Sequence, residues 1–565
     1  MNHPENVSGR AVLRRAVTGQ WRRVAAAAAL GAGHQAGEAL VPVLVGVVID
    51  RAVATSDGAA LGRWLLVLAV VFAGLSTSYR LSARATEAAS ERAAHAVRIA
   101  LVRRVLDPRG GAETGRLPGA LVNIATGDAR RVGLVNWALA GAVAAVCGLV
   151  VGAVALLRVS VPLGLVVLLG APPLLWLSHV LSKPLERRSE AEQEQAARAS
   201  GLAADLVAGL RVLKGIGAEP TAVERYRRTS RLSLAATLRA ARAEAWQGGA
   251  MLTLTGLFIA LVALVGGRLA AQGDISVGEL VAAVGLAQLL LSPLMILSFC
   301  SAEFAQARAS AGRVAEVLGA PHAVAGGSGA LPVPVRGELR VSGVTLGPLR
   351  GLSLTVRPGE LLGVVTPDPA AASALVRCLG READPDAGTV RLDGVDLTSV
   401  EPAEVRASVV VAAHDADLFE GTLLENVLAS SGDRPGADRA LAAATADEVA
   451  AALPAGVDTV LDERGRSLSG GQRQRVALAR ALAADAPVLV VHDPTTAVDA
   501  VTEARIAEGL RDLRRGRTTI VIATSPALLA TADRVVIVED GDVRAEGTHA
   551  ELVRDHAAYR AAVLG

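Results

Sequence analysis

The chain has 565 residues, more than one ordinary domain holds, and hydrophobic residues make up 52% of it against 20% charged residues. This balance is too apolar for an average soluble protein, and it indicates membrane-spanning segments. The 57 Lys and Arg residues nearly cancel the 55 Asp and Glu residues, so the charge totals argue against a nucleic-acid partner.

Five arginines precede the first apolar stretch: Arg10, Arg14, Arg15, Arg22 and Arg23. That stretch, Val24–Ile49, is longer than the hydrophobic region of a secretory signal. We therefore expect it to be retained as the first membrane span.

Six apolar stretches are candidate spans, because a spanning helix needs about 20 mostly apolar residues. They are Val24–Ile49, Trp64–Tyr79, Val132–Leu157, Val159–Leu181, Trp246–Ala271 and Val277–Cys300. The second is short and needs a few residues before Trp64 to cross fully. Together they predict three helical hairpins with outer turns near Asp57, Arg158 and Asp274.

Two long polar stretches, Arg80–Arg131 and Lys183–Glu244, separate the hairpins and are rich in arginine. An excess of Lys and Arg marks the cytoplasmic side of a membrane protein. The N-terminus, both polar stretches and the C-terminal region are therefore expected in the cytoplasm. Leu202, Leu206 and Leu210 recur at helical spacing, which predicts that the spanning helices continue beyond the membrane.

Ionisable groups inside spans are costly and often functional. His34 and Glu38 lie one helical turn apart in the first span, and Glu303 lies near the end of the last. These three residues are candidates for a substrate pathway, with interhelical hydrogen bonding or an interfacial position as the alternative for each. Aromatic residues are only 2% of the chain, so no aromatic cage indicates the substrate.

Pro and Gly cluster in Gly319–Gly337, which indicates a linker. Beyond Glu338, short β-rich runs such as Leu361–Val365 and Val488–Val491 alternate with helical patterns, as in an α/β domain. We therefore expect a membrane domain over residues 1–315, a linker over 316–337 and an α/β domain over 338–565. The cysteines, at positions 147, 300 and 378, have no metal-ligand spacing and are expected to be reduced, structural thiols.

The most specific motif is L-S-G-G-Q, formed by Leu468, Ser469, Gly470, Gly471 and Gln472. It stands directly before a helix rich in Ala, Leu and Arg. A hydroxyl, two glycines and the free N–H groups of a helix N-terminus can together hold a phosphate. A simple turn entering a helix is the alternative.

With this motif before the strand Val488–Val491, the chain resembles the ABC transporter family, whose signature motif is L-S-G-G-Q. The order of segments resembles the exporter-type half-transporter of that family. This resemblance implies an all-α transmembrane domain of six helices followed by an α/β P-loop-type nucleotide-binding domain. It also implies ATP and Mg²⁺ as cofactors, a dimer of two such chains, and a location in the cell membrane with both termini in the cytoplasm.

Three further stretches carry the resemblance. Thr459–Gly465 resembles the loop that senses the membrane domain in exporters. Asp493–Asp499 resembles the family stretch that begins at the catalytic carboxylate and ends at the aspartate of the D-loop, here Asp499. Gly209–Glu219 resembles the coupling-helix region, which implies a coupling role for Gly215, Ile216, Gly217, Ala218 and Glu219.

The phosphate-binding loop departs from the family pattern. The family has G-x-x-x-x-G-K-[ST] between a strand and a helix, and its lysine meets the β- and γ-phosphates. The matching stretch here is Thr366–Ser373, with Thr366 and Ala371 in place of the glycines and Ala372 in place of the lysine. We therefore expect weak ATP binding at this loop.

Two other residues of the loop also predict weak ATP binding. Pro369 lacks the N–H that a phosphate cradle uses, and Asp368 places a negative charge where phosphate charge would lie. Ser373 keeps the hydroxyl that could contribute weakly to Mg²⁺ binding.

The remaining catalytic positions also differ from the family. His492 occupies the position where the family has its Mg²⁺-associated aspartate. Asp493 occupies the position of the catalytic glutamate, and its side chain is one methylene shorter than that of glutamate. His414 replaces the expected glutamine, and Thr524 replaces the switch histidine. No aromatic residue lies near Val344–Pro348 to stack on adenine.

An intact signature beside a degenerate ATP site predicts a heterodimer. In this family each ATP lies between the phosphate loop of one chain and the signature of the other. We therefore expect this chain to be inactive alone, and to give its signature to a second half-transporter whose phosphate loop is intact. Its transported substrate would be a lipid, peptide, drug or secondary metabolite. Membrane lipid is a further expected partner, and nucleic acid is not.

Two alternatives remain open at the level of sequence. The same fold could take up siderophores instead of exporting a substrate. The chain could also be a regulatory membrane pseudo-ATPase that transports nothing, although the complete signature argues against this.

Overall fold

The computed structural model describes residues 7–414, 417–429 and 433–564 of the chain. They form two compact units: a helical unit, which comprises residues up to 100 and 122–316, and an α/β unit, which comprises residues 101–121 and those from 317 onward. All strands of the described chain lie in the α/β unit. A helical membrane domain followed by an α/β nucleotide-binding fold is the predicted fold class, and it is confirmed.

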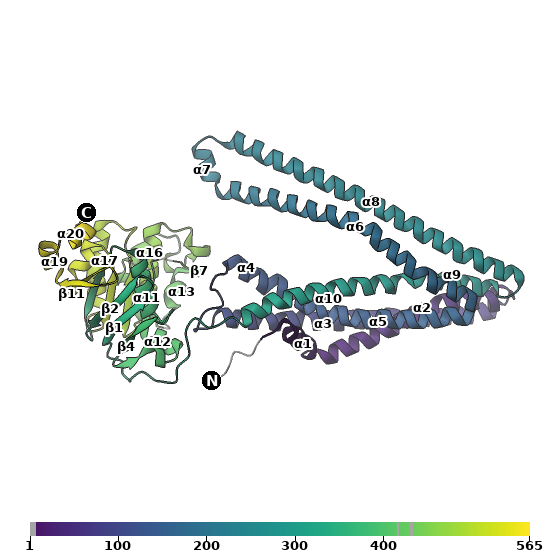
Figure 1. Ribbon diagram of the computed structural model, residues 1–565, viewed down its shortest axis with the longest axis horizontal. Helices are drawn as coiled ribbons and strands as arrows, with labels where there is room; N and C mark the ends of the chain where they lie inside the picture. Colours follow the sequence, from purple (N-terminus) through teal and green to yellow (C-terminus); the bar gives the residue numbers. More distant parts are fainter. Residues whose placement is uncertain (1–6, 415–416, 430–432, 565) are drawn as a thin grey trace. The chain divides into compact units, whose positions relative to one another are not determined.

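Long helices joined by short turns make up the helical unit (Figure 1). The helices up to the linker are α1 (Gly9–Thr18), α2 (Trp21–Val48), α3 (Gly58–Val105), α4 (Pro118–Asn123), α5 (Ala129–Val159), α6 (Val161–Ala208), α7 (Leu210–Gly215), α8 (Glu219–Gln272), α9 (Val277–Leu289) and α10 (Leu291–Leu318). Most of α4 lies within residues 101–121 of the α/β unit. Helices α6 and α8 lie side by side, and the short α7 joins them at one end.

Five helical stretches of the described chain are long and apolar enough to cross a membrane. They are Gly58–Val105, Pro118–Val159, Val161–Ala208, Glu219–Gln272 and Val277–Leu318. Helix α2 is not among them, because His34, Gln35 and Glu38 lower the hydropathy of its middle. Five of the six expected spans are thus confirmed as suitable helices, and the first stays a prediction.

The polar stretches between the hairpins are largely helical, as expected. Helices α3 and α6 each have 48 residues and α8 has 54, whereas crossing a bilayer takes about 20. The spanning helices therefore continue well past the length that a membrane needs.

Glycines let α2 and α9 approach closely. A Cβ atom on Gly46 would lie 2.4 Å from the carbonyl oxygen of Gly278, so neither position has room for a side chain. At the same end, the carboxylate of Asp50 accepts hydrogen bonds from Ser276 Oγ at 2.5 Å and from the Gly278 N–H at 2.9 Å. Backbone proximity and a partly buried polar contact together fix this helix pair.

The main sheet of the α/β unit has the strand order β12-β11-β3-β10-β9-β6. Its strands are β3 (Leu361–Val365), β6 (Val409–Ala412), β9 (Val488–His492), β10 (Thr518–Ile522), β11 (Arg534–Glu539) and β12 (Asp542–Gly547). All neighbours are parallel except β11 and β12. The parallel strands are rich in Val, Ile and Leu because helices cover both faces of the sheet.

Side chains alternate between the two faces along β9. Val488 and Val490 pack with α11 (Pro369–Leu379) in one core cluster, while Leu489 and Val491 pack with α16 (Gly470–Ala483) and α17 (Ala500–Leu513) in another. The period of two thus places α11 on one face of the sheet and α16 and α17 on the other.

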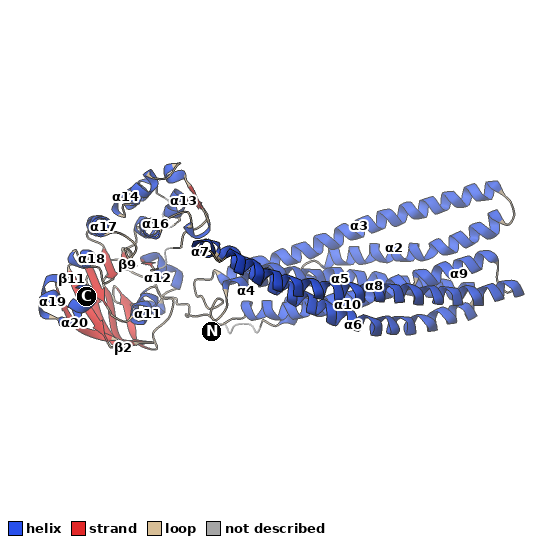
Figure 2. Cartoon of the chain, turned by 90° about the horizontal axis from the view of Figure 1, so that it is seen from above, coloured by secondary structure: helices blue, strands red, loops and turns tan. Residues whose placement is uncertain are grey.

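Two smaller sheets complete the α/β unit. The antiparallel sheet β2-β1-β4-β5 contains β1 (Leu339–Leu346), β2 (Leu349–Val356), β4 (Ala387–Leu392) and β5 (Val395–Asp396), and β7 (Gly421–Thr422) pairs with β8 (Val460–Leu461). Figure 2 shows the main strands together and α13 (Leu423–Leu428), α14 (Arg434–Ala443) and α16 in a separate, helical part. The remaining helices are α12 (Pro402–Ser408), α15 (Ala446–Ala451), α18 (Pro526–Ala530), α19 (His549–Asp555) and α20 (Ala557–Leu564).

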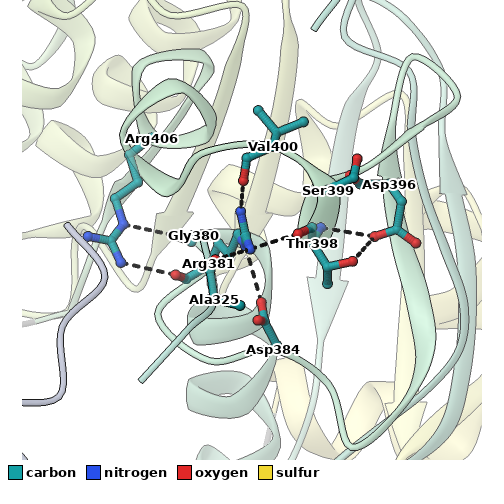
Figure 3. A network of polar contacts seen from close by, with 9 residues as sticks. All are labelled: Ala325, Gly380, Arg381, Asp384, Asp396, Thr398, Ser399, Val400 and Arg406. Carbon is teal, nitrogen blue, oxygen red and sulfur yellow. Dashed lines mark hydrogen bonds and ion pairs between the residues drawn. The ribbon is translucent and has the colours of Figure 1, made fainter. Parts of the chain in front are cut away.

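A buried arginine connects the end of α11 to the linker. Arg381 is only 1% exposed, and its guanidinium donates to the backbone carbonyls of Ala325, Thr398 and Val400 (Figure 3). Arg406 in turn donates to the carbonyl of Arg381 at 3.0 Å. The charge is tolerated in the core because its donors meet oxygen acceptors.

Part of the first polar stretch belongs to the α/β unit through a set of contacts that we call the first-loop clasp. Arg104 donates to the carbonyl of Ala320 at 2.8 Å, and Arg109 Nε lies 3.0 Å from Glu401 Oε1. The carbonyl of Arg109 accepts the N–H of Ala323 at 3.0 Å. The hydrogen bond with Glu401 raises the pKa of Arg109. Both arginines thereby attach residues 101–121 to the linker and to the α/β fold.

Candidate functional site

Most of the predicted nucleotide-site residues gather at one edge of the main sheet, where parallel strands present their carboxyl ends. Thr366 follows β3, Asp493 follows β9 and Thr524 follows β10. These three residues and His492 line one cavity of about 350 Å³. Ligand sites of open α/β sheets lie at this edge, so the topology explains why residues from distant segments meet.

Side chains in the turn from β3 into α11 form hydrogen bonds with the backbone of that same segment. Asp368 is the N-cap of α11, and its carboxylate accepts the N–H of Ala370 at 2.9 Å. Pro369 occupies the first helical position, where it has no N–H to offer. The Ser373 hydroxyl donates to the Pro369 carbonyl at 2.9 Å, one turn back along the helix.

The two alanines of this stretch belong to the hydrophobic core. Ala371 is 3% exposed and Ala372 is 4% exposed, and both pack in the cluster between α11 and the sheet. A methyl group at position 372 ends in the core and supplies no positive charge to the cavity.

Two imidazoles flank the carboxylate after β9. Asp493 Oδ2 lies 3.7 Å from His492 Nε2 and 3.9 Å from His414 Nδ1, and the two rings are 5.8 Å apart. Asp493 holds a left-handed backbone conformation with φ of 47°, and its N–H donates to Ile522 at 2.9 Å. Within the part of the chain that the structure describes, no group of three His, Cys, Asp or Glu side chains has the geometry to hold a metal ion.

A second cavity, of about 530 Å³, lies on the other side of the same turn. Thr366, Asp368 and Ala371 of the phosphate-loop stretch line this cavity. Arg350 and Asp540 line it as well. Its lining combines the three carboxylates of Asp368, Glu539 and Asp540 with one guanidinium, an acidic balance that differs from the cationic surroundings phosphate groups prefer.

The signature motif forms the start of α16. Ser469 is the N-cap: its hydroxyl accepts the N–H of Gln472 at 3.3 Å, and its own N–H donates to the Gln472 side chain at 2.8 Å. Leu468 is buried beneath the turn, at 4% exposed, whereas Ser469 is exposed. The helix N-terminus is therefore capped by a neutral hydroxyl that solvent can reach.

The second glycine of the motif is required by packing within this chain. A Cβ on Gly471 would lie 2.5 Å from the carbonyl oxygen of Ala497. Gln474, the second residue after the motif, donates to Thr496 Oγ1 at 2.7 Å and accepts the N–H of Ala497 at 2.9 Å. The signature stretch in the sequence runs on to Gln474, but the pattern assigned no role to this residue. The signature thus holds the stretch that leads to Asp499.

Asp499 caps the helix that follows. Its carboxylate accepts the N–H groups of Val501 at 3.1 Å and Thr502 at 3.0 Å at the start of α17. Hydrogen bonds from Thr502 hold the pKa of Asp499 below its usual value. A helix-capping role therefore accounts for this residue in the single chain.

The membrane-pathway candidates are only partly brought together. His34 Nδ1 lies 3.1 Å from the Leu75 carbonyl, its Nε2 lies 3.9 Å from Glu38, and its ring lies 5.3 Å from that of Tyr79. Glu303, on α10, has no ion pair with another described residue. The first two candidates form a polar group between α2 and α3, and Glu303 is separate from it.

The stretch that resembles a coupling helix contains the short helix α7, Leu210–Gly215. It ends before Ile216, and Gly217 then takes a left-handed conformation with φ of 65°. Helix α8 begins at Glu219, with Ala218 as its N-cap. The predicted coupling residues therefore lie in the sharp reversal between two long helices.

Comparison with known proteins covers both units. Residues 24–294 match the family described as ABC transporter transmembrane region, and residues 349–496 match the family described as ABC transporter. The first match covers the long helices, and the second ends inside the stretch 493–499.

Curated relatives are about a third identical to this chain over the aligned residues. A multidrug efflux ATP-binding/permease protein of Mycobacterium bovis is 33% identical over 533 residues, which are 92% of this chain and 44% of that protein. The chain thus spans less than half of that relative. An ATP-dependent lipid A-core flippase of Burkholderia pseudomallei is 30% identical over 70% of this chain and 68% of its own length. A cyclolysin secretion/processing ATP-binding protein of Bordetella pertussis is 34% identical over 71% of this chain and 57% of its own length.

Among solved structures, a bacterial Atm1-family ABC exporter with ATP bound matches with a TM-score of 0.75. The match covers 98% of both chains at 24% sequence identity, so it shows a shared fold.

Proposed function

Because this chain belongs to the ABC transporter family and has the fold of its exporters, we propose that it is the degenerate half of an ATP-driven heterodimeric exporter. In this proposal its signature, Ser469–Gln472, completes an ATP site on a second half-transporter with an intact phosphate loop. Its own nucleotide site does not turn over ATP.

The start of α11 is the observation that carries the proposal. Helix N-termini bind phosphate through free N–H groups and a favourable dipole. Here the Asp368 carboxylate already accepts the N–H of Ala370, and Pro369 contributes no donor. A phosphate group would have to displace or lie against a like charge. The residues present therefore do not fit a bound triphosphate.

The chemistry at the ends of β9 and β10 supports the same conclusion. Mg²⁺ prefers carboxylate, hydroxyl and water oxygens in octahedral geometry. His492 stands where the family has an aspartate, and the Ser373 hydroxyl is engaged with the Pro369 carbonyl. Thr524 stands where the family has its switch histidine. Together these residues offer one carboxylate, Asp493, between two imidazoles.

The start of α16, by contrast, fits a γ-phosphate from a partner. Ser469 is exposed, carries no charge, and precedes two glycines whose N–H groups stand at the helix N-terminus. ATP bound there would supply the free energy that brings together the nucleotide-binding domains of the two half-transporters. The residues of this chain would orient the terminal phosphate and carry the movement to Asp499 through Gln474 and Ala497.

We further propose that movement reaches the membrane helices through the two long polar stretches, with Gly215–Glu219 as one coupling site. The relatives are named for multidrug efflux, lipid A-core flipping and cyclolysin secretion, so the exported substrate is proposed to be an amphiphilic molecule or a peptide. His34, Glu38 and Glu303 would contribute polar groups to its path.

ATPase activity in lipid tests the proposal. The chain is measured alone, with a candidate partner, and in pairs that carry Ser469→Ala here or a phosphate-loop Lys→Ala in the partner. Activity only in the pair, lost with either substitution, is the expected result. Comparable activity from this chain alone would overturn the asymmetric site. A pair that hydrolyses ATP but moves no substrate would favour a regulatory role.

A further inference from the structure

The short helix α1 is amphipathic, and its apolar face is already covered by its own chain. Val12, Leu13 and Ala16 are buried on this face. Asn136 of α5 lies 3.4 Å from the Ala16 carbonyl, which it donates to. A Cβ on Gly9 would lie 3.0 Å from the backbone nitrogen of Gly312 in α10. Helix α1 is therefore held against α5 and α10 of the helical unit.

The outward surface of α1 and of the start of α2 is cationic. Residues 7–37 contain five arginines and neither Asp nor Glu. Four of these arginines are exposed and form no ion pair with a described residue: Arg10, Arg14, Arg22 and Arg23. Arg23 does donate to the Gln20 side chain at 2.8 Å, which leaves its charge uncompensated.

An exposed tryptophan lies within this cationic surface. Trp21 is 62% exposed, and the Arg22 guanidinium lies 5.9 Å from the centre of its ring. Tryptophan is enriched at the boundary between hydrocarbon and water. It is the first residue of α2, and the apolar stretch predicted as the first span begins three residues later, at Val24. That prediction places the surface at the edge of the bilayer.

We propose that Arg10, Arg14, Arg22 and Arg23, with Trp21 among them, form a binding surface for the headgroups of anionic phospholipids. We call this surface the basic face. Clustered arginines next to a membrane attract anionic headgroups, and guanidinium groups bind phosphate by paired hydrogen bonds. The inference rests on the membrane placement in the proposed function, and it adds a lipid class that the transport proposal does not specify.

The covered apolar face determines how the lipid is recognised. An interfacial helix that inserts its apolar side gains affinity from buried acyl contacts, and this contribution is insensitive to salt. In α1 that side packs on α5 and α10 instead. Recognition then depends on charge, which salt screens beyond about 10 Å at 0.1 M ionic strength. Binding should therefore discriminate by headgroup charge and weaken as salt rises.

Native mass spectrometry of the full chain in detergent tests the proposal with phosphatidylglycerol and phosphatidylcholine as probes. The test variant carries Arg10→Gln, Arg14→Gln, Arg22→Gln and Arg23→Gln. The matched control carries four substitutions at exposed arginines of the α/β unit: Arg357→Gln, Arg377→Gln, Arg391→Gln and Arg439→Gln. Phosphatidylglycerol affinity should fall at least about tenfold in the test variant, since each juxtamembrane arginine contributes roughly fivefold.

Phosphatidylcholine affinity and the control variant should stay unchanged. Equal loss in both variants, or no loss in the test variant, overturns the basic face. A second measurement on the unaltered chain guards against misfolding: raising salt from about 0.05 to 0.5 M should weaken phosphatidylglycerol binding, and constant affinity would refute recognition by charge. Because the readout is lipid binding, it stands whether or not the chain supports ATP turnover.

Discussion

Helices α11 and α16 both begin directly after a turn in the α/β unit, and their first turns differ in charge. Helix α16 is capped by the neutral hydroxyl of Ser469, while α11 is capped by the carboxylate of Asp368 and starts with Pro369. Each capping side chain accepts a backbone N–H of its own helix, from Gln472 in α16 and from Ala370 in α11. The difference is in what else can bind, since a carboxylate at a helix N-terminus takes the place of an external anion.

This contrast shows that the start of α11 is ordered by contacts within the chain. The buried methyl groups of Ala371 and Ala372 pack α11 on the sheet, and the Asp368 cap orders its first turn. The loop therefore remains well built without phosphate. Exchanging the two capping residues tests whether charge alone separates the two sites, because serine and aspartate are comparable N-caps.

The largest effect is expected when the charge is placed on the signature. Ser469→Asp keeps the cap of α16 and adds a carboxylate where the partner's γ-phosphate would bind. ATP turnover by the proposed heterodimer should fall at least about 100-fold, in the range found when one transition-state contact is removed. Steady-state ATPase measures it, with Ser469→Thr as the neutral control. Turnover within about twofold of the unaltered pair would mean that the signature does not contact phosphate.

The next effect concerns stability and separates packing from ligand binding in the same motif. Gly471→Ala forces a Cβ to within 2.5 Å of the Ala497 carbonyl, so it should destabilise the fold by about 2 kcal/mol. Thermal unfolding of the full chain without nucleotide reports the change. Gly436→Ala in α14 is the control, because its Cβ has no contact closer than 3.4 Å and alanine favours a helix. Equal midpoints for the two variants would remove the packing explanation.

A smaller gain is expected from the opposite exchange. Asp368→Ser retains the cap of α11 and removes the like charge, so binding of an ATP analogue to the isolated chain should tighten by about tenfold or less. The remaining obstacles, Pro369 and the missing lysine, limit the gain. Equilibrium binding with a fluorescent analogue measures it. Tight binding before any substitution would show that the Asp368 carboxylate does not exclude phosphate.

The smallest effect distinguishes structural capping from ligand exclusion. Asp499 caps α17 as Asp368 caps α11, and hydrogen bonds from Thr502 lower its pKa. A lowered folded-state pKa stabilises the fold above the unfolded value of about 3.9 and loses that contribution as pH falls through the folded value. Asp499→Asn should therefore lower the unfolding midpoint more at pH 7 than at pH 3. A deficit independent of pH would contradict this assignment.

The architecture of this protein could be predicted from its sequence because two periodicities are strong. Long apolar runs specified five spanning helices, and β-rich runs such as Val488–Val491 specified buried parallel strands. For the first predicted span, composition alone does not establish a membrane-spanning helix. His34, Gln35 and Glu38 make α2 less apolar than its neighbours, and only its neighbours in space can compensate for them.

Local chemistry at the site was readable where it depends on adjacent residues. Aspartate followed by proline is a standard signal for a helix start, so the cap at Asp368 could have been found in the sequence. The contact between Gly471 and Ala497 could not, because it joins a helix start to a turn on another element. Nor does any spacing show that Arg381 is buried among carbonyl groups of the linker.

The first-loop clasp also sets an order of events during synthesis. Arg104 meets Ala320 across 216 residues of sequence, and Arg109 meets Glu401 across 292. At the usual rate of about 5–20 residues per second, the ribosome needs roughly 15–60 s to supply the second partner. Arg104 lacks its partner until Ala320 has been made, and Arg109 lacks its ion-pair partner until Glu401 follows. The polypeptide must leave one of its early segments unfinished until its later domain emerges.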